Sequence, residues 1–123
     1  MSRRTYFLLI VVVLAAVLLA ACGGGGGGGG SGAALNVTIS ATEFKFDPAT
    51  INAAPGQTIN LTVTNKGAIE HNFVLPQANV KFTTDPGKTS TKTFTAPAAG
   101  TYVIDCDIPG HKEAGMVAQL VVK

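Results

Sequence analysis

Apolar and polar residues alternate along much of the chain after residue 33. At positions 35–39 and 59–63, every second residue is leucine, isoleucine or valine, and the residues between them are polar. A period of two is typical of β-strands that bury one face. Similar short runs predict further strands at residues 43–46, 50–53, 71–75, 80–82, 89–95, 101–106 and 117–122.

Short turn sequences separate these predicted strands, and no segment shows the period of an amphipathic helix. The turn sequences are Asp47-Pro48, Pro55-Gly56, Asn65-Lys66-Gly67, Asp85-Pro86-Gly87 and Ala99-Gly100. About eight short strands in about ninety residues predict one all-β domain at residues 33–123. We expect its strands to form a Greek-key β-sandwich or barrel.

The first 22 residues have the composition of an export signal. Arg3 and Arg4 form a positively charged start, and residues 8–20 are an unbroken apolar run. The sequence Leu-Ala-Ala-Cys that ends at Cys22 resembles the lipobox of bacterial lipoproteins, in which the cysteine becomes lipidated. We therefore predict a signal peptide at residues 1–22 and lipidation of Cys22. An uncleaved membrane anchor is the alternative, and the Sec and twin-arginine export routes both stay open.

Glycine dominates the segment that follows Cys22. Eight consecutive glycines precede Ser31 and Gly32, so residues 23–32 have almost no side chains to bury. This composition is typical of a flexible linker. We expect the linker to tether the exported domain to the outer face of the cell membrane, periplasmic or extracellular.

The distribution of charge excludes some classes of partner. Nine lysine and arginine residues against seven acidic residues give a formal net charge of +2, but Arg3 and Arg4 account for that excess, so residues 33–123 are neutral. A neutral domain lacks the basic surface of a nucleic-acid-binding protein. Its partners must therefore be selected by local patches.

The residues that carry chemistry lie in the last quarter of the chain. Cys106, His111 and Met116 follow at the spacing Cys-x4-His-x4-Met, on a loop between two predicted strands. His71, the only other histidine, begins a predicted strand upstream. Two histidines, a cysteine and a weakly bound methionine are the ligand set of a trigonal blue copper site, where sulfur and imidazole suit both oxidation states. The pattern predicts a site for one copper ion.

These motifs resemble those of the cupredoxins, the type 1 blue copper proteins that include auracyanin, azurin and plastocyanin. Residues 102–122 resemble the C-terminal copper loop of that family, and residues 70–73 resemble its upstream histidine motif. The resemblance covers the whole of residues 33–123. It implies three equatorial ligands and one axial ligand, which are His71, Cys106 and His111, and Met116.

The resemblance also assigns roles around the metal. Asn72 resembles an asparagine that braces the cysteine loop, usually through a hydroxyl residue, whose place Asp107 takes in this sequence. A contact between the Glu70 carbonyl and copper stays open, because azurin has glycine at that position. His111 is expected near the solvent inside an apolar docking patch. That patch would consist of Ile108, Pro109, Gly110 and Pro76.

These features predict a monomeric electron carrier rather than an enzyme. Its partners would be other redox proteins, such as a cytochrome or a respiratory or photosynthetic complex, and the membrane through the lipid anchor. A cysteine nucleophile with a histidine base would also need an orienting third group and an oxyanion pocket, and the sequence marks neither.

The small number of possible ligands limits the other metal functions, because one copper site uses all of them. Copper oxidases and nitrite reductases need further copper sites, and the dinuclear CuA centre needs two bridging cysteines. Zinc could occupy a site of two histidines and one cysteine. The main alternative is a copper-binding or copper-delivery lipoprotein that does not transfer electrons.

Overall fold

The structure is a computed structural model that describes residues 32–123. The predicted signal peptide, Cys22 and residues 23–31 of the predicted linker lie outside the described residues. Nine β-strands and one short 3-10 helix form the described chain, which confirms the predicted all-β class. In chain order they are β1 (Leu35–Thr42), β2 (Lys45–Asp47), β3 (Thr50–Ala53), β4 (Thr58–Asn65), β5 (His71–Leu75), η1 (Pro76–Ala78), β6 (Val80–Thr84), β7 (Thr89–Thr95), β8 (Gly100–Asp105) and β9 (Val117–Val122).

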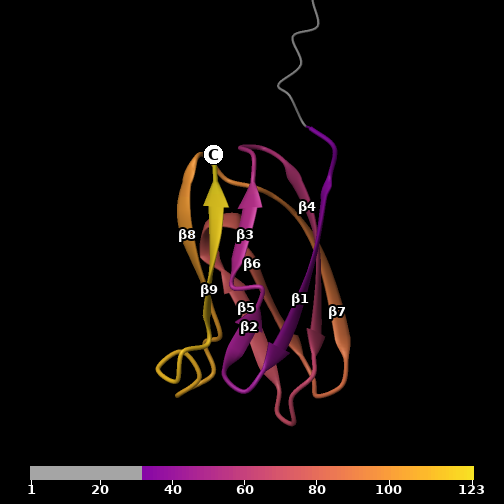
Figure 1. Cartoon of the computed structure of the whole chain (residues 1–123), viewed down its shortest axis with the longest axis vertical. Coiled ribbons are helices and arrows are strands. Elements are labelled where there is room, and N and C mark those ends of the chain that lie inside the picture. Colours follow the sequence, from indigo (N-terminus) through magenta and orange to yellow (C-terminus); the bar gives the residue numbers. More distant parts are fainter. Residues whose placement is uncertain (1–31) are drawn as a thin grey trace, which may run out of the picture.

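The strands form two sheets packed as a β-sandwich (Figure 1). One sheet has the order β2-β1-β4-β7, and the other has the order β3-β9-β8-β5-β6. Strand β1 runs parallel to β4, and β3 runs parallel to β9, whereas the remaining pairs are antiparallel. Each parallel pair joins segments that are distant in sequence, so both sheets depend on long-range strand pairing.

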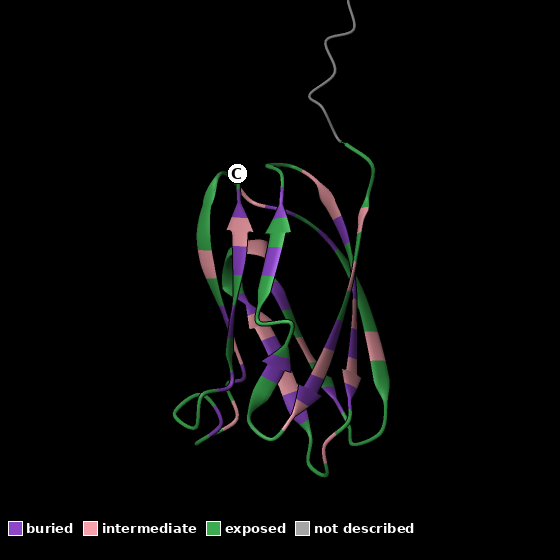
Figure 2. Ribbon diagram, in the orientation of Figure 1, coloured by how far each residue is buried: buried purple, intermediate pink, exposed green. Residues whose placement is uncertain are grey.

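The hydrophobic core lies between the two sheets (Figure 2). In β4 the buried side chains of Ile59, Leu61 and Val63 alternate with more exposed polar residues, as the sequence pattern predicts. Phe46 of β2 and Phe73 of β5 meet edge to face across the core, with ring centroids 5.7 Å apart. Removal of these apolar surfaces from water is the main force that holds the sheets together.

Several strand boundaries differ from those expected by one or two residues, and two of these differences lie next to the loops at one end of the sandwich. The predicted strand at residues 43–46 begins at Lys45 instead, because Thr42 pairs with Lys45 and leaves Glu43 and Phe44 as the hairpin turn. The strand expected to end at Cys106 ends one residue earlier. The N–H of Cys106 donates to the carbonyl of Met116 at 3.2 Å, which closes the base of the loop between β8 and β9.

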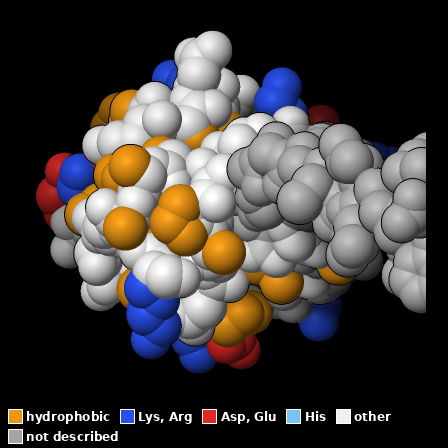
Figure 3. Space-filling view, turned by 90° about the horizontal axis from the view of Figure 1, so that it is seen from above, with side chains coloured by type: hydrophobic (Ala, Val, Ile, Leu, Met, Phe, Trp, Pro, Cys, Tyr) orange, Lys and Arg blue, Asp and Glu red, His pale blue; other side chains and the backbone are white. Residues whose placement is uncertain are grey.

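Four connections gather at one end of the sandwich, namely the β1–β2 turn, the β4–β5 loop, the β6–β7 turn and the β8–β9 loop (Figure 1). The described chain begins at the other end, beside the C-terminus. Figure 3 views the molecule from that other end, and no histidine side chain is visible there. Within residues 32–123 no helix has the length and apolar character needed to cross a membrane.

Candidate metal centre

Three of the four predicted ligands come together at the end of the sandwich that carries these loops. His71 begins β5, Cys106 directly follows β8, and His111 lies on the loop before β9. Their ligand atoms all lie within 4.8 Å of one another. The Nδ1 atoms of the two histidines are 3.3 Å apart, and Cys106 Sγ is 3.4 Å from His111 Nδ1.

The spacing of these atoms fits a single metal ion. Three ligands at about 2.0–2.3 Å from one ion in a trigonal arrangement are about 3.5–4.0 Å from one another. The observed separations of 3.3 and 3.4 Å are close to this range. Two imidazoles and a thiolate suit copper in both oxidation states, so the donor set fits copper as well as zinc.

Solvent has little access to these side chains. The exposed fractions are 1% for His71, 0% for Cys106 and 8% for His111. The pKa of His71 is lowered, mainly by burial and next by the neighbouring His111. A neutral imidazole has a lone pair available for a metal, so burial favours the form of His71 that can bind.

Met116 lies at the base of the same loop and is fully buried. Its N–H donates to the carbonyl of His111 at 3.0 Å, and its carbonyl accepts the hydrogen bond from Cys106. These bonds place its backbone next to those of two candidate ligands, His111 and Cys106. Its assignment as the axial ligand stays a prediction.

The loop that carries His111 is a series of tight turns. The N–H of His111 donates to the carbonyl of Ile108 at 3.0 Å, and that of Gly115 donates to the carbonyl of Lys112 at 2.9 Å. Gly110 and Gly115 have φ values of 86° and 106°, which side chains with a β-carbon rarely adopt. Two glycines thus allow a short loop to turn His111 back beneath the end of the sheet.

A buried asparagine organises the loop that leads into His71. The side chain of Asn65, 0% exposed, donates to the carbonyls of Ile69 at 2.7 Å and Thr84 at 2.9 Å. Its side-chain oxygen accepts the N–H of Gly67 at 2.8 Å. Because a buried amide satisfied in this way resists displacement, Asn65 fixes the path of the chain just before the first ligand.

The brace expected between Asn72 and Asp107 is present. The amide of Asn72 donates to Asp107 Oδ1 at 2.7 Å, and its oxygen accepts from the Thr83 hydroxyl at 2.7 Å. Lys81 forms an ion pair with Asp107. The pKa of Asp107 is lowered, first by the hydrogen bond from Lys81 and then by that from Asn72. A carboxylate therefore takes the part expected of a hydroxyl, and a lysine on β6 completes the brace.

Asn72 also contacts the sulfur of the candidate ligand Cys106 directly. Its backbone N–H donates to Cys106 Sγ at 3.3 Å. A donor directed at sulfur stabilises the negative charge of a thiolate and adjusts the electronic properties of a bound metal. The backbone and side chain of Asn72 thus both act on the cysteine loop.

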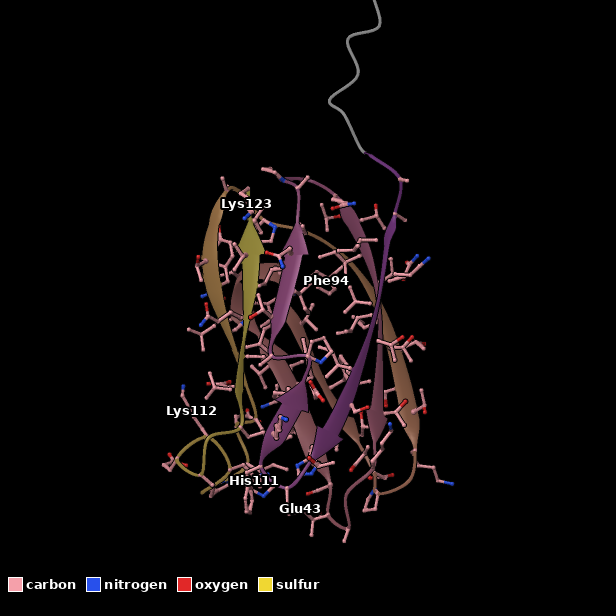
Figure 4. The ribbon with its side chains drawn as sticks, viewed as in Figure 1. Glu43, Phe94, His111, Lys112 and Lys123 are labelled. Atoms are coloured by element: carbon pink, nitrogen blue, oxygen red, sulfur yellow. The ribbon has the colours of Figure 1, made fainter. Side chains whose placement is uncertain are left out.

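Glu43 lies at the same end of the molecule as His111 (Figure 4), and Phe44 follows it, although sequence analysis did not assign either residue to the site. The ring of Phe44 meets that of His111 at a centroid distance of 5.0 Å and an angle of 74°. Glu43 Oε1 accepts the N–H of Ala68, at 2.5 Å, and of Ile69, at 3.2 Å. Glu43 therefore ties the β1–β2 turn to the loop before His71. Sequence analysis had included both residues in the predicted strand at 43–46 and had given them no role at the site.

The expected docking patch is only partly assembled. Pro109 and Gly110 are exposed near His111, and Ile108 is partly buried against the core. The placement of Pro76 in this patch is wrong. Pro76 follows the last residue of β5, five positions from His71, and a strand of that length spans about 17 Å. Two other exposed apolar residues lie closer to the candidate ligands. Phe44, 37% exposed, packs against the ring of His111, and Ile69, 40% exposed, precedes His71 by two residues.

Comparison with known families agrees with this arrangement. A family model of the cupredoxin-like domain matches residues 8–122. The chain belongs to the cupredoxin-like family. The resemblance inferred from the copper-loop and histidine motifs is therefore confirmed.

One relative of this cupredoxin is a bacterial cuproprotein. It is 35% identical over 109 residues to the copper-resistant cuproprotein CopI of Rubrivivax gelatinosus. That alignment covers 72% of this chain and 66% of CopI, so the chain spans just under two thirds of its relative.

Two solved auracyanins share the fold. Dithionite-reduced auracyanin from Roseiflexus castenholzii superposes with a TM-score of 0.67 and 28% identity, covering 75% of this chain and 99% of that protein. Auracyanin A, a "blue" copper protein from Chloroflexus aurantiacus, gives a TM-score of 0.59 and 28% identity, covering 72% and 99%. The fold of the cupredoxin domain is thus that of small blue copper proteins.

Substitution of Glu43 by glutamine should reduce the acid sensitivity of the metal-free cupredoxin. The pKa of Glu43 is lowered, chiefly by the hydrogen bond from the Ala68 N–H. Such a carboxylate stabilises the fold above its unfolded pKa of about 4.3, and this contribution is lost as the pH falls through the lower folded value. Urea unfolding between neutral pH and about pH 3 should therefore show a shallower acid loss in Glu43→Gln than in wild type.

Glu113→Gln is the matched control, because Glu113 is an exposed carboxylate on the loop between β8 and β9. Its acid profile should follow that of wild type. Identical profiles for Glu43→Gln and wild type would show that the carboxylate of Glu43 does not stabilise the β1–β2 turn.

Proposed function

We propose that this cupredoxin is a mobile electron carrier that uses one type 1 copper ion. The observation that carries the proposal is the buried group of His71, Cys106 and His111, the one cluster of three histidine, cysteine or acidic side chains within ligand distance in residues 32–123. Copper bound there would supply a one-electron Cu(I)/Cu(II) couple. Met116 is the proposed axial ligand.

Rigid support of the ligands favours this chemistry. His71 is held by its strand and by the Asn65 loop, and Cys106 is held by its bond to Met116 and by the Asn72 brace. Ligands that move little between two oxidation states leave a small barrier to electron transfer. The protein's contribution is thus to keep the same donor geometry in both states.

Burial of the cysteine supports the expectation that the protein is not an enzyme. Catalytic cysteines are partly accessible to their substrates. Cys106 has an exposed fraction of 0% and is packed among the other proposed ligands. We therefore propose a metal-binding role for its thiolate and no nucleophilic one.

Spectroscopy of the copper-loaded domain tests this proposal. The wild type should show the intense visible band and the spin-resonance signature of a thiolate-bound type 1 copper, and Cys106→Ser should lose the band because it lacks the thiolate. Met116→Leu is the matched ligand variant and should keep the band with a shifted potential, because the axial bond is weak. A Cys106→Ser protein that stays blue would contradict the assignment.

A second candidate is copper binding or delivery without electron transfer. The 35% identity to a copper-resistant cuproprotein favours it. The two functions make different demands on the metal, because a carrier must change oxidation state and keep its ion, whereas a delivery protein must release it. Repeated chemical reduction and oxidation at constant copper content supports the carrier. Loss of copper in each cycle supports delivery.

Apolar side chains around His111 form the proposed docking surface for redox partners. Phe44 lies against the His111 ring, and Ile69 precedes His71 by two residues. Ile108 and Pro109 lie on the loop between β8 and β9. Such a patch permits brief contact close to the metal, which suits a neutral domain that acts as a monomer.

Electron self-exchange between two copies tests this surface. Ile69→Lys should slow self-exchange by roughly tenfold at low salt, because the lysine ammonium groups of the two copies would repel each other and lose hydration at the contact. Val103→Lys is the control, since Val103 is also exposed and apolar, at 51%, but lies within β8. Nuclear magnetic resonance line broadening measures both rates. Equal rates in the two variants would place electron exchange on another face.

The proposed location is the outer face of the cell membrane, where a lipidated Cys22 would anchor the exported domain. Sequence alone supports this part, through the lipobox-like residues 19–22 and the glycine linker. Cys22→Ala should appear in the soluble fraction or as an unprocessed precursor, because the lipid that gives stable membrane residence cannot be attached. Membrane fractionation with mass spectrometry measures both outcomes. Unchanged processing and retention would instead indicate a protein anchor.

A further inference from the structure

Two buried polar atoms beside the metal centre lack a hydrogen-bond partner. They are Nε2 of His71 and Oγ1 of Thr84, and no other side-chain nitrogen or oxygen atom in the described part of the chain is in this position. Both residues are 1% exposed, so solvent cannot satisfy these atoms. Buried polar groups without partners are rare in native proteins because they lose their hydration and gain nothing.

The two residues face each other across two strands. His71 of β5 is paired directly with Thr84 of β6. Directly opposed residues of an antiparallel pair project from the same face, with β-carbons about 4.5–5.5 Å apart. The carbonyl of Thr84 is in turn held by the amide of Asn65 at 2.9 Å. A fixed backbone thus presents the Thr84 hydroxyl beside the His71 ring.

The two nitrogens of His71 have different surroundings. Nδ1 faces His111 Nδ1, at 3.3 Å, within the cluster of ligand atoms. If Nδ1 offers its lone pair to a metal, the proton of the neutral ring must be on Nε2. Histidine ligands almost always donate that second N–H to an acceptor, and this bond fixes the tautomer and the ring orientation.

We propose that Thr84 is a positioning residue of the metal centre, whose hydroxyl is hydrogen-bonded to the Nε2 proton of His71 through one buried water. This bond selects the tautomer of His71 in which Nδ1 can bind the metal. The inference rests on the metal-binding part of the proposed function and is independent of electron transfer.

Three variants separate this role from a packing effect. Thr84→Val keeps the shape of the side chain and removes the hydroxyl, whereas Thr84→Ser keeps the hydroxyl and removes a methyl group. Thr91→Val makes the same chemical change at an exposed position on β7. Each protein is assayed for zinc and copper affinity by chelator competition, for metal-free stability by urea unfolding, and for the His71 tautomer by nitrogen-15 resonance at alkaline pH.

We expect Thr84→Val to lose affinity for both metals by about 10- to 100-fold. Thr84→Ser and Thr91→Val should bind like wild type. In the metal-free protein, Thr84→Val should be slightly less stable than wild type, because the Nε2 proton of His71 loses its acceptor. Its His71 should show less of the Nε2-protonated tautomer.

Unchanged metal affinity in a folded Thr84→Val protein would overturn the proposal. So would a loss of affinity without a change of tautomer, since Thr84 would then act through packing alone. Failure of the electron-carrier function is a separate result, because a wild type that binds copper but cannot be reduced reversibly would still show the effect of Thr84 on affinity and tautomer.

Discussion

The close approach of three electron-rich atoms is the constraint on which the rest of this structure depends. Two imidazole nitrogens lie 3.3 Å apart and a sulfur lies 3.4 Å from one of them, in a place that water barely reaches. When all three atoms present lone pairs, as binding of one metal ion would require, those lone pairs repel one another, and burial removes the screening that would weaken the repulsion. Only a framework fixed by other interactions can keep them together. The satisfied amide of Asn65, the hydrogen bonds of Asn72 and the closed base of the loop at Cys106 provide that framework.

The parts of this molecule that sequence could predict are those encoded locally. Alternation of apolar residues reveals strands, and Cys106 and His111 are close enough along the chain for their spacing to indicate a shared loop. Contacts set by strand register are different, because one sequence does not show which residues face each other across a sheet. Lys81 and Thr84 approach the site through such pairings, and Phe44 approaches it through the turn that the pairing of β1 with β2 sets.

The errors have the same origin. Pro76 is near His71 in sequence, but an extended strand carries it away from the metal end. Phe44 and Phe46 look equivalent in an alternating segment, and yet a two-residue turn sends the first to the surface beside His111 and leaves the second in the core. Extended chain moves about 3.3 Å per residue, so a displacement of a few positions takes a residue into or out of a site.

The parallel pairing of β3 with β9 has a consequence for the order in which this protein matures. Residues 50–53 find their partners at residues 119–122, which are synthesised after every other described strand. The loop that carries Cys106 and His111 is flanked by β8 and β9, so its two ends come together only when β9 has joined the sheet. Long-range pairing of this kind is slow to form. The three candidate ligands therefore come together only in a chain that is already folded, so a metal ion that needs all three could bind only at a late stage in the life of each molecule.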